Sequence, residues 1–137
     1  MLPKLLVVSN VEKRARLLPL LESEEFNIDM AIGFQDGIRK LSTSPSYDLL
    51  IVDAELPDGS WKNLLLFVQN SEMDCEMIIL ARHGDPQLWA EVIQCGAYDL
   101  ISEPVEQKEV AHIVRSALEG RYMRRFIRPA AVTLAEA

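Results

Sequence analysis

The chain has 137 residues, of which 49% are hydrophobic and 26% charged, with a net charge of −7. This length suits one domain, and the balance is that of a folded globular protein rather than a disordered one. The acidic character argues against direct binding of nucleic acid, because phosphate contacts need clustered cations. The longest apolar runs, such as Leu64 to Val68, are far shorter than the roughly 20 residues that span a bilayer, so we expect no membrane contact.

The compartment is suggested by the two cysteines and by the start of the chain. Cys75 and Cys95 stand alone, with neither metal-ligand spacing nor the density of a disulfide scaffold. Met1 to Lys4 leads directly into a strand pattern, without the features of a signal peptide. We therefore expect reduced thiols and a cytoplasmic protein.

The first predicted elements are a strand, a helix and a second strand. Leu5 to Val8 is a continuous apolar run, typical of a strand that is covered on both faces. Val11 to Ser23 predicts a helix, and Phe26 to Ile32 alternates apolar with polar or small residues, which favours an edge strand. The expected inner face of the helix carries Val11, Ala15, Leu18 and Leu21.

The middle of the chain predicts two further helices around one strand. Gln35 to about Leu41 has a helical pattern that Gly37 weakens. Leu49 to Val52 is a second continuous apolar run, which predicts a buried strand. Ser60 is placed to cap a helix that runs to Asn70.

The last predicted elements complete the alternation. Met77 to Leu80 and the weaker Tyr98 to Ile101 are further strand patterns. Between them, Asp85 and Pro86 predict a capped helix that ends at Cys95, before Gly96. A final helix carries an apolar stripe of Val110, Ile113, Val114, Ala117 and Leu118. Five strand–helix units in alternation predict an α/β fold with a parallel sheet covered by helices on both faces.

Ligands and chemistry in such sheets gather at the carboxyl ends of the strands. The order and spacing of several short motifs there resemble the receiver domain of two-component response regulators, over about residues 3–120. The resemblance implies a flavodoxin-like (βα)5 three-layer sandwich with the strand order 2-1-3-4-5. The matching segments are Tyr47–Asp53, Leu56–Gly59, His83–Pro86, Cys95–Ile101 and Glu103–Val105.

In that family, an aspartate at the end of the third strand accepts a phosphoryl group from a histidine kinase, and the matching residue is Asp53. The resemblance also implies a divalent metal, Mg²⁺, held by an acidic pair and by the acceptor, because hard oxygen ligands suit that ion. This chain departs from the pattern at most of those positions. Ser9 and Asn10 replace the acidic pair, Ala81 replaces a hydroxyl residue, and Glu103 replaces a lysine.

The reversal at Glu103 has the largest electrostatic effect. A phosphoryl group would meet repulsion there of about 4 kcal/mol per pair of unit charges at about 4 Å and an effective dielectric of about 20. Two interpretations of Arg82 stay open: it turns inward as a replacement counter-charge for Asp53 or Glu103, or it points into solvent. Glu55 could join Asp53 and Glu103 in a weakened Mg²⁺ site, or form part of an acidic rim without metal.

The C-terminal end differs in charge from the body. Residues 1–114 hold 9 basic and 19 acidic side chains, whereas residues 115–137 hold 5 and 2. We expect a receiver-like domain over residues 1–120 and a helical extension, linker or tail over residues 121–137. Three interpretations of that end stay open: a connector to another segment, a dimerisation helix, or a tail that touches membrane or nucleic acid.

Two functions are consistent with these residues. The first is a non-enzymatic interaction module in bacterial two-component signalling, a pseudo-receiver that works without phosphorylation and binds a histidine kinase, an output domain or another signalling protein. The second is a receiver still phosphorylated at Asp53 by a cognate kinase through an altered pocket. A sensor of a small ligand in the same cleft is a weaker third, because no glycine-rich phosphate loop follows the first strand.

Overall fold

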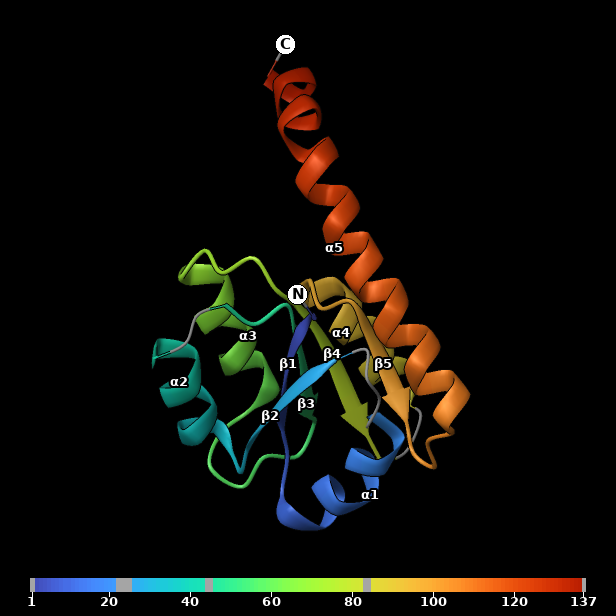
Figure 1. Ribbon diagram of the computed structural model, residues 1–137. Helices are drawn as coiled ribbons and strands as arrows, with labels where there is room; N and C mark the ends of the chain where they lie inside the picture. Colours follow the sequence, from blue (N-terminus) through green and yellow to red (C-terminus); the bar gives the residue numbers. More distant parts are fainter. Residues whose placement is uncertain (1, 22–25, 44–45, 83–84, 137) are drawn as a thin grey trace.

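The computed structural model describes the backbone of residues 2–21, 26–43, 46–82 and 85–136, and their side chains except those of residues 11, 14 and 122–136. Strands and helices alternate along the whole chain (Figure 1). The elements are β1 (Lys4–Val8), α1 (Val11–Leu21), β2 (Asn27–Ala31), α2 (Phe34–Thr43), β3 (Leu49–Asp53), α3 (Trp61–Asn70), β4 (Glu76–Ala81), α4 (Pro86–Cys95), β5 (Asp99–Ser102) and α5 (Gln107–Glu136).

The five strands form one parallel sheet in the order β2-β1-β3-β4-β5. This confirms the predicted flavodoxin-like sandwich and its strand order. The three inner strands β1, β3 and β4 are almost entirely buried, as continuous apolar runs require. The edge strand β2 is half-exposed along most of its length, which agrees with its alternating pattern.

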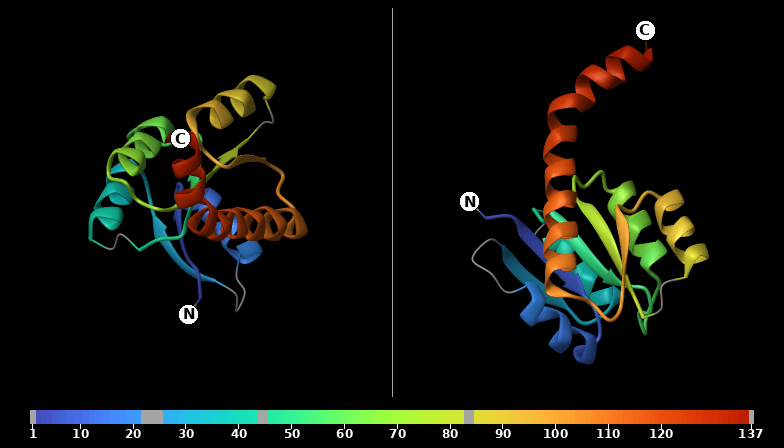
Figure 2. Two further views of the ribbon diagram at one scale, coloured as in Figure 1. Left: turned by 90° about the horizontal axis from the view of Figure 1, so that it is seen from above. Right: turned by 90° about the vertical axis from the view of Figure 1, so that its right-hand side faces the viewer.

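Helices cover both faces of the sheet. Figure 2 shows α2, α3 and α4 on one side and α1 and α5 on the other. Alternate residues of each strand supply the two cores, because successive strand side chains point to opposite faces. On β3, for example, Leu50 and Val52 pack under α2, α3 and α4, whereas Leu49 and Ile51 pack under α1 and α5.

Two helices begin and end where their capping residues predict. The Ser60 side chain accepts a hydrogen bond from the Asn63 backbone N–H at 3.2 Å and caps α3. The Asp85 side chain caps α4 in the same way, and α4 ends at Gly96, whose φ of 101° lies in the left-handed region. Glycine suits that position because a Cβ would strain the backbone there.

The inner face of α1 differs from the expected one. Of the expected residues, Leu21 is buried, Leu18 is half-buried and Ala15 is exposed. The buried residues of the described helix are Lys13, Leu17 and Leu21. These three residues are four apart, so they lie on one stripe of the helix. The expectation was wrong at Ala15 and omitted Lys13, because a charged residue is assigned to the outer face in a hydrophobicity pattern. The side chain of Val11 lies outside the described part.

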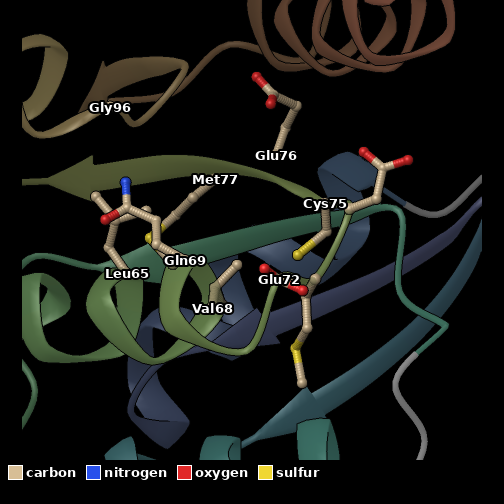
Figure 3. A pocket seen from close by; sticks show the side chains of 10 residues that line it. Leu65, Val68, Gln69, Glu72, Cys75, Glu76, Met77 and Gly96 are labelled. Atoms are coloured by element: carbon tan, nitrogen blue, oxygen red, sulfur yellow. The ribbon is translucent and has the colours of Figure 1, made fainter. Parts of the chain in front are cut away.

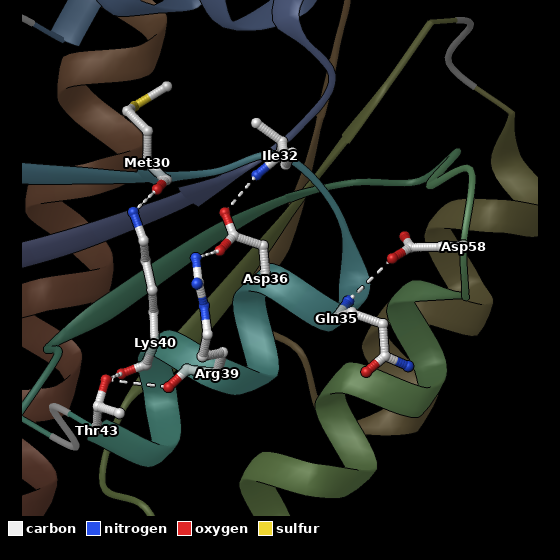
Figure 4. Close-up of polar contacts among 8 residues, drawn as sticks. All are labelled: Met30, Ile32, Gln35, Asp36, Arg39, Lys40, Thr43 and Asp58. Carbon is white, nitrogen blue, oxygen red and sulfur yellow. Dashed lines mark hydrogen bonds and ion pairs between the residues drawn. The ribbon is translucent and has the colours of Figure 1, made fainter.

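The helix α2 is longer than predicted at both ends, and a tertiary contact explains its start. Asp58, in the loop after β3, accepts hydrogen bonds from the backbone N–H groups of Phe34 and Gln35 at 2.7 and 3.0 Å. Figure 4 shows the Asp58 carboxylate facing this first turn. Gly33 and Gly59 permit the approach: a Cβ on Gly33 would lie 2.6 Å from the Asp58 Oδ1 atom, and one on Gly59 would lie 2.6 Å from the Phe34 ring.

The helix α5 is the longest element, with 30 residues, or about 45 Å at 1.5 Å per residue. Its first part packs on the sheet through Val110, Val114 and Ala117, and its last part projects beyond the sheet (Figures 1 and 2). None of the described helices is both long enough and apolar enough to cross a membrane.

Candidate functional site

The carboxyl ends of the strands meet at one edge of the sheet, at the bottom of Figure 1. Parallel register brings the strand-end residues level with one another: Asp53 pairs with Leu80, and Ala81 pairs with Ser102. The residues singled out from the sequence therefore gather at this edge, as expected. They are Ser9, Asn10, Asp53, Glu55, Ala81, Arg82 and Glu103.

Asp53 is fully buried at the end of β3, with 0% of its surface exposed. Its Oδ1 atom accepts a hydrogen bond from the Lys13 Nζ atom at 2.7 Å and another from the Glu55 backbone N–H at 3.0 Å. Its Oδ2 atom is also buried and has no hydrogen-bond partner among the described residues. A buried carboxylate is costly unless it is paired, and Lys13 supplies the pairing charge.

Lys13 reaches Asp53 because α1 begins directly after β1. The Asn10 Oδ1 atom accepts a hydrogen bond from the Lys13 backbone N–H at 2.8 Å, as an N-cap residue does. The Lys13 side chain is buried against Asp53, and only 2% of it is exposed. Removing one partner of a buried ion pair lowers the stability of a protein by about 3–5 kcal/mol, because the remaining charge stays buried and unpaired.

The ends of β4 and β5 add no buried cation among the described residues. Ala81 is buried at the end of β4 and offers only a methyl group, which donates no hydrogen bond. Glu103 follows β5, is half-buried, and donates its backbone N–H to the Ala81 carbonyl at 2.8 Å. The described edge therefore holds one lysine and two carboxylates close to the sheet, Asp53 and Glu103.

Two residues left open by the sequence are placed toward solvent. Arg82 is exposed, and the counter-charge of Asp53 comes from Lys13 instead. Glu55 is also exposed, and its contact with Asp53 is made by its backbone N–H rather than by its carboxylate. In the described part of the chain, no three histidine, cysteine or acidic side chains are grouped as metal ligands.

The family model for the response regulator receiver domain matches residues 5–115 of this chain. The chain belongs to the response regulator receiver domain family. It is thus a receiver domain of two-component signalling, and receiver domains are in general signalling modules rather than enzymes.

Relatives of this receiver domain are longer proteins. It is 26% identical over 83 residues to the response regulator protein PilR of Pseudomonas aeruginosa, covering 61% of this chain and 19% of PilR. It is 27% identical over 113 residues to the transcriptional regulatory protein DltR of Streptococcus agalactiae, covering 82% of this chain and 50% of DltR. The chain spans about a fifth to a half of these relatives' lengths.

Solved receiver structures share its fold. The signal receiver domain of an HD domain-containing protein from Pseudomonas fluorescens superposes with a TM-score of 0.79 at 27% identity, covering 90% of this chain and 99% of that one. NtrX from Brucella abortus, solved in complex with ADP, superposes with a TM-score of 0.85 at 21% identity, covering 93% of this chain and 30% of NtrX.

The edge at which the carboxyl ends of the strands meet is called the receiver edge below. Its residues do not fit the divalent metal that the family resemblance implies. Magnesium requires about six oxygen ligands near 2.0–2.1 Å, yet Asp53 Oδ1 and Asn10 Oδ1 already accept hydrogen bonds from Lys13. A divalent ion about 4 Å from the Lys13 ammonium would meet repulsion of about 8 kcal/mol at an effective dielectric of about 20. Lys13 and a metal therefore compete for the same carboxylate.

Two of the hollows in the described part of the receiver domain lie at opposite ends of the sheet. One of about 300 Å³ adjoins Lys13 and is lined mostly by apolar side chains of α1, β4 and the chain after β5, including Leu17 and Val105. The other, of about 560 Å³, lies at the amino edge of the sheet and includes Cys75 and Gly96 (Figure 3). Burial raises the pKa of the Cys75 thiol to about 12, so it is protonated at neutral pH and is a poor nucleophile.

The decisive residue that sequence reasoning missed is Lys13. Its signal was present in the spacing, because Lys13, Leu17 and Leu21 are four residues apart and form a stripe. A hydrophobicity pattern assigns lysine to the outside, since buried lysines are rare unless they are paired. The stripe can be recognised as the buried face only when Asp53 is known to lie opposite Lys13.

Proposed function

We propose that this receiver domain is a non-enzymatic interaction module whose signalling does not depend on phosphorylation of Asp53. The observation that carries the proposal is the buried ion pair between Asp53 and Lys13, 2.7 Å long. Phosphorylation requires an acceptor oxygen in contact with the donor's phosphorus atom. Here one oxygen is bound by the ammonium, and the other is shielded from solvent.

The neighbouring residues support the same proposal. A phosphoryl group on Asp53 would have no hydroxyl donor at Ala81 and a carboxylate at Glu103. The hydroxyl group and the lysine that would hold the phosphoryl oxygens are thus replaced by a methyl group, which makes no hydrogen bond, and by a carboxylate, which repels them.

The proposed contact surface is formed by α4, β5 and α5. Trp89 and Ile93 lie one turn apart on α4 and are 51% and 39% exposed. The Trp89 Nε1 atom donates a hydrogen bond to the Asp99 Oδ1 atom of β5 at 3.2 Å, which orients the indole on this surface. Exposed aromatic side chains held in one orientation are effective anchors for a protein partner, such as a histidine kinase or an output domain.

The first test is chemical. We expect no added phosphoryl mass on the intact protein after incubation with Mg²⁺ and a small phosphodonor such as acetyl phosphate. A receiver domain known to autophosphorylate, treated in parallel, controls for the donor. Stable labelling of Asp53 would refute the proposal and support the second candidate, a working phosphoacceptor, which the retained carboxylate at the end of β3 favours.

The second test measures pathway output in the source organism. The variant Lys13→Met/Asp53→Asn removes the acceptor without leaving a buried unpaired charge, and we expect it to retain output. Trp89→Ala should lose output, whereas Leu66→Ala should retain it, because Leu66 is equally exposed at 52% but lies on α3. Loss of output in the double variant, with folding intact by circular dichroism, would show that the acceptor is needed.

A further inference from the structure

The Lys13 ammonium neutralises the negative charge of Asp53 in the interior of the protein. The ammonium and the carboxylate are 2.7 Å apart, and the two side chains are 2% and 0% exposed. At that distance the contact is a charge-assisted hydrogen bond, stronger than one between neutral groups. The two opposite charges balance each other, so the pair is neutral without any ion from solution.

The local backbone holds the ammonium in this place. Asn10 caps the first turn of α1 through the Lys13 N–H, and Leu17 and Leu21 bury the same stripe of the helix against the sheet. Asp53 is held in turn by the Glu55 N–H, which closes the turn after β3. The backbone of Lys13 is thus held by Asn10, and the carboxylate of Asp53 is held by the backbone N–H of Glu55.

We infer that the Lys13 ammonium is a tethered cation that occupies the place on Asp53 where the family resemblance puts a divalent metal. It neutralises the carboxylate and holds the β3–α3 turn in one state, whatever the Mg²⁺ concentration. Lys13 is a positioning residue, because it acts on the β3–α3 turn through Asp53. This role rests on the proposed function, in which Asp53 is not phosphorylated.

Thermal unfolding with and without cations tests the inference. We expect millimolar Mg²⁺ or Mn²⁺, compared with EDTA at matched ionic strength, to leave the wild-type Tm unchanged. Lys13→Met should lower the Tm by about 10 °C or more, because it leaves Asp53 buried and unpaired. Added Mg²⁺ or Mn²⁺ should then restore part of the loss, since a cation that binds only the folded state stabilises it.

Two further variants separate a tethered cation from simple packing. Lys13→Met/Asp53→Asn should show a higher Tm than Lys13→Met and no response to cations, because no charge remains to be neutralised. Arg16→Met, which removes an exposed cation one turn further along α1, should change neither the Tm nor the cation response. A Lys13→Met protein that loses no stability, or that loses stability without cation rescue, would overturn the inference.

A measurement on the wild-type protein keeps the inference testable if Lys13→Met does not fold. Mn²⁺ should cause no site-specific paramagnetic broadening of the amide NMR signals around Asp53. Broadening that disappears in Lys13→Met/Asp53→Asn would show that the metal binds beside the lysine, and would overturn the inference. The proposed function would still stand in that case if the double variant retains pathway output. Phosphoryl labelling of Asp53 by acetyl phosphate without Mn²⁺ binding would refute only the proposed function.

Discussion

A single side chain decides the chemistry of the receiver edge. Asp53 stands where the resemblance predicts a phosphoacceptor, but its environment depends on Lys13, which lies 40 residues away in sequence. Leaving either charge alone in the interior would cost about 3–5 kcal/mol. The pair therefore couples α1 to β3 strongly, and the acceptor position becomes part of the structural core.

Asp58 shows the same dependence on a distant partner at the surface. The backbone N–H groups of Gln35 and Phe34 lower the pKa of the Asp58 carboxyl below its ordinary value of 3.8. A carboxyl with a lowered pKa stabilises the fold above its unfolded pKa, and that stabilisation is lost as the pH falls through the folded pKa. The cap on α2 is therefore fully present at neutral pH, begins to weaken below about pH 4, and is lost as the pH falls further through the lowered pKa of Asp58.

We expect Asp58→Ala to lower the Tm at pH 7, because the first turn of α2 loses its cap. The difference from wild type should shrink as the pH falls below about 4, since protonation weakens the cap in the wild-type protein as well. Melting curves from pH 3 to 7 measure both effects. Glu119→Gln, a neutralised carboxyl on the exposed side of α5, is the control. A difference that stayed constant with pH would show that the charge of Asp58 is irrelevant.

Arg121 ties α5 to the amino edge of the sheet. The Arg121 Nε atom donates a hydrogen bond to the Asp74 carbonyl at 2.6 Å, and its Nη1 atom lies 2.8 Å from the Asp48 Oδ1 atom. Asp48 also accepts a hydrogen bond from the Lys4 backbone N–H at 2.8 Å. One guanidinium thus links α5 to the segments that precede β3 and β4, with the planar geometry that suits arginine.

Removing this link should loosen α5 at the point where it leaves the sheet. We expect Arg121→Gln to lower the free energy of unfolding by about 2 kcal/mol, because bonds to charged groups are lost. Amide hydrogen exchange should speed up around residues 118–126. Lys108→Gln removes an exposed cation from the same helix and should change neither quantity. Equal exchange in the two variants would mean that α5 does not depend on Arg121.

On the scale of the whole molecule, the receiver edge and the projecting end of α5 lie at opposite ends of the sheet (Figure 1). The proposed contact surface on α4, β5 and α5 runs between these ends. We propose that residues 1–120 are the receiver unit and that residues 121–137 connect it to a further partner or to a second copy. The basic charge of that end, with 5 basic and 2 acidic side chains after residue 114, contrasts with the acidic body.

The sequence by itself determined the fold and most of its boundaries. Continuous apolar runs marked the buried strands, and local caps such as Ser60 and Asp85 set the starts of α3 and α4, because these signals act within a few residues. It also placed Asp53, Ala81 and Glu103 together, since parallel strands bring their carboxyl ends to one edge.

Only the tertiary structure decided which side chains meet at that edge, which face of α1 is buried and where α2 begins. Long-range contacts placed Lys13 against Asp53 and Asp58 against the start of α2, over separations of 40 and up to 24 residues. No local pattern encodes such pairs, because a lysine or an aspartate reads as a surface residue until its partner is known. The inner face of α1 was mispredicted in part, and the start of α2 was placed one residue late, for this one physical reason: the free energy of a charged group depends on what lies opposite it.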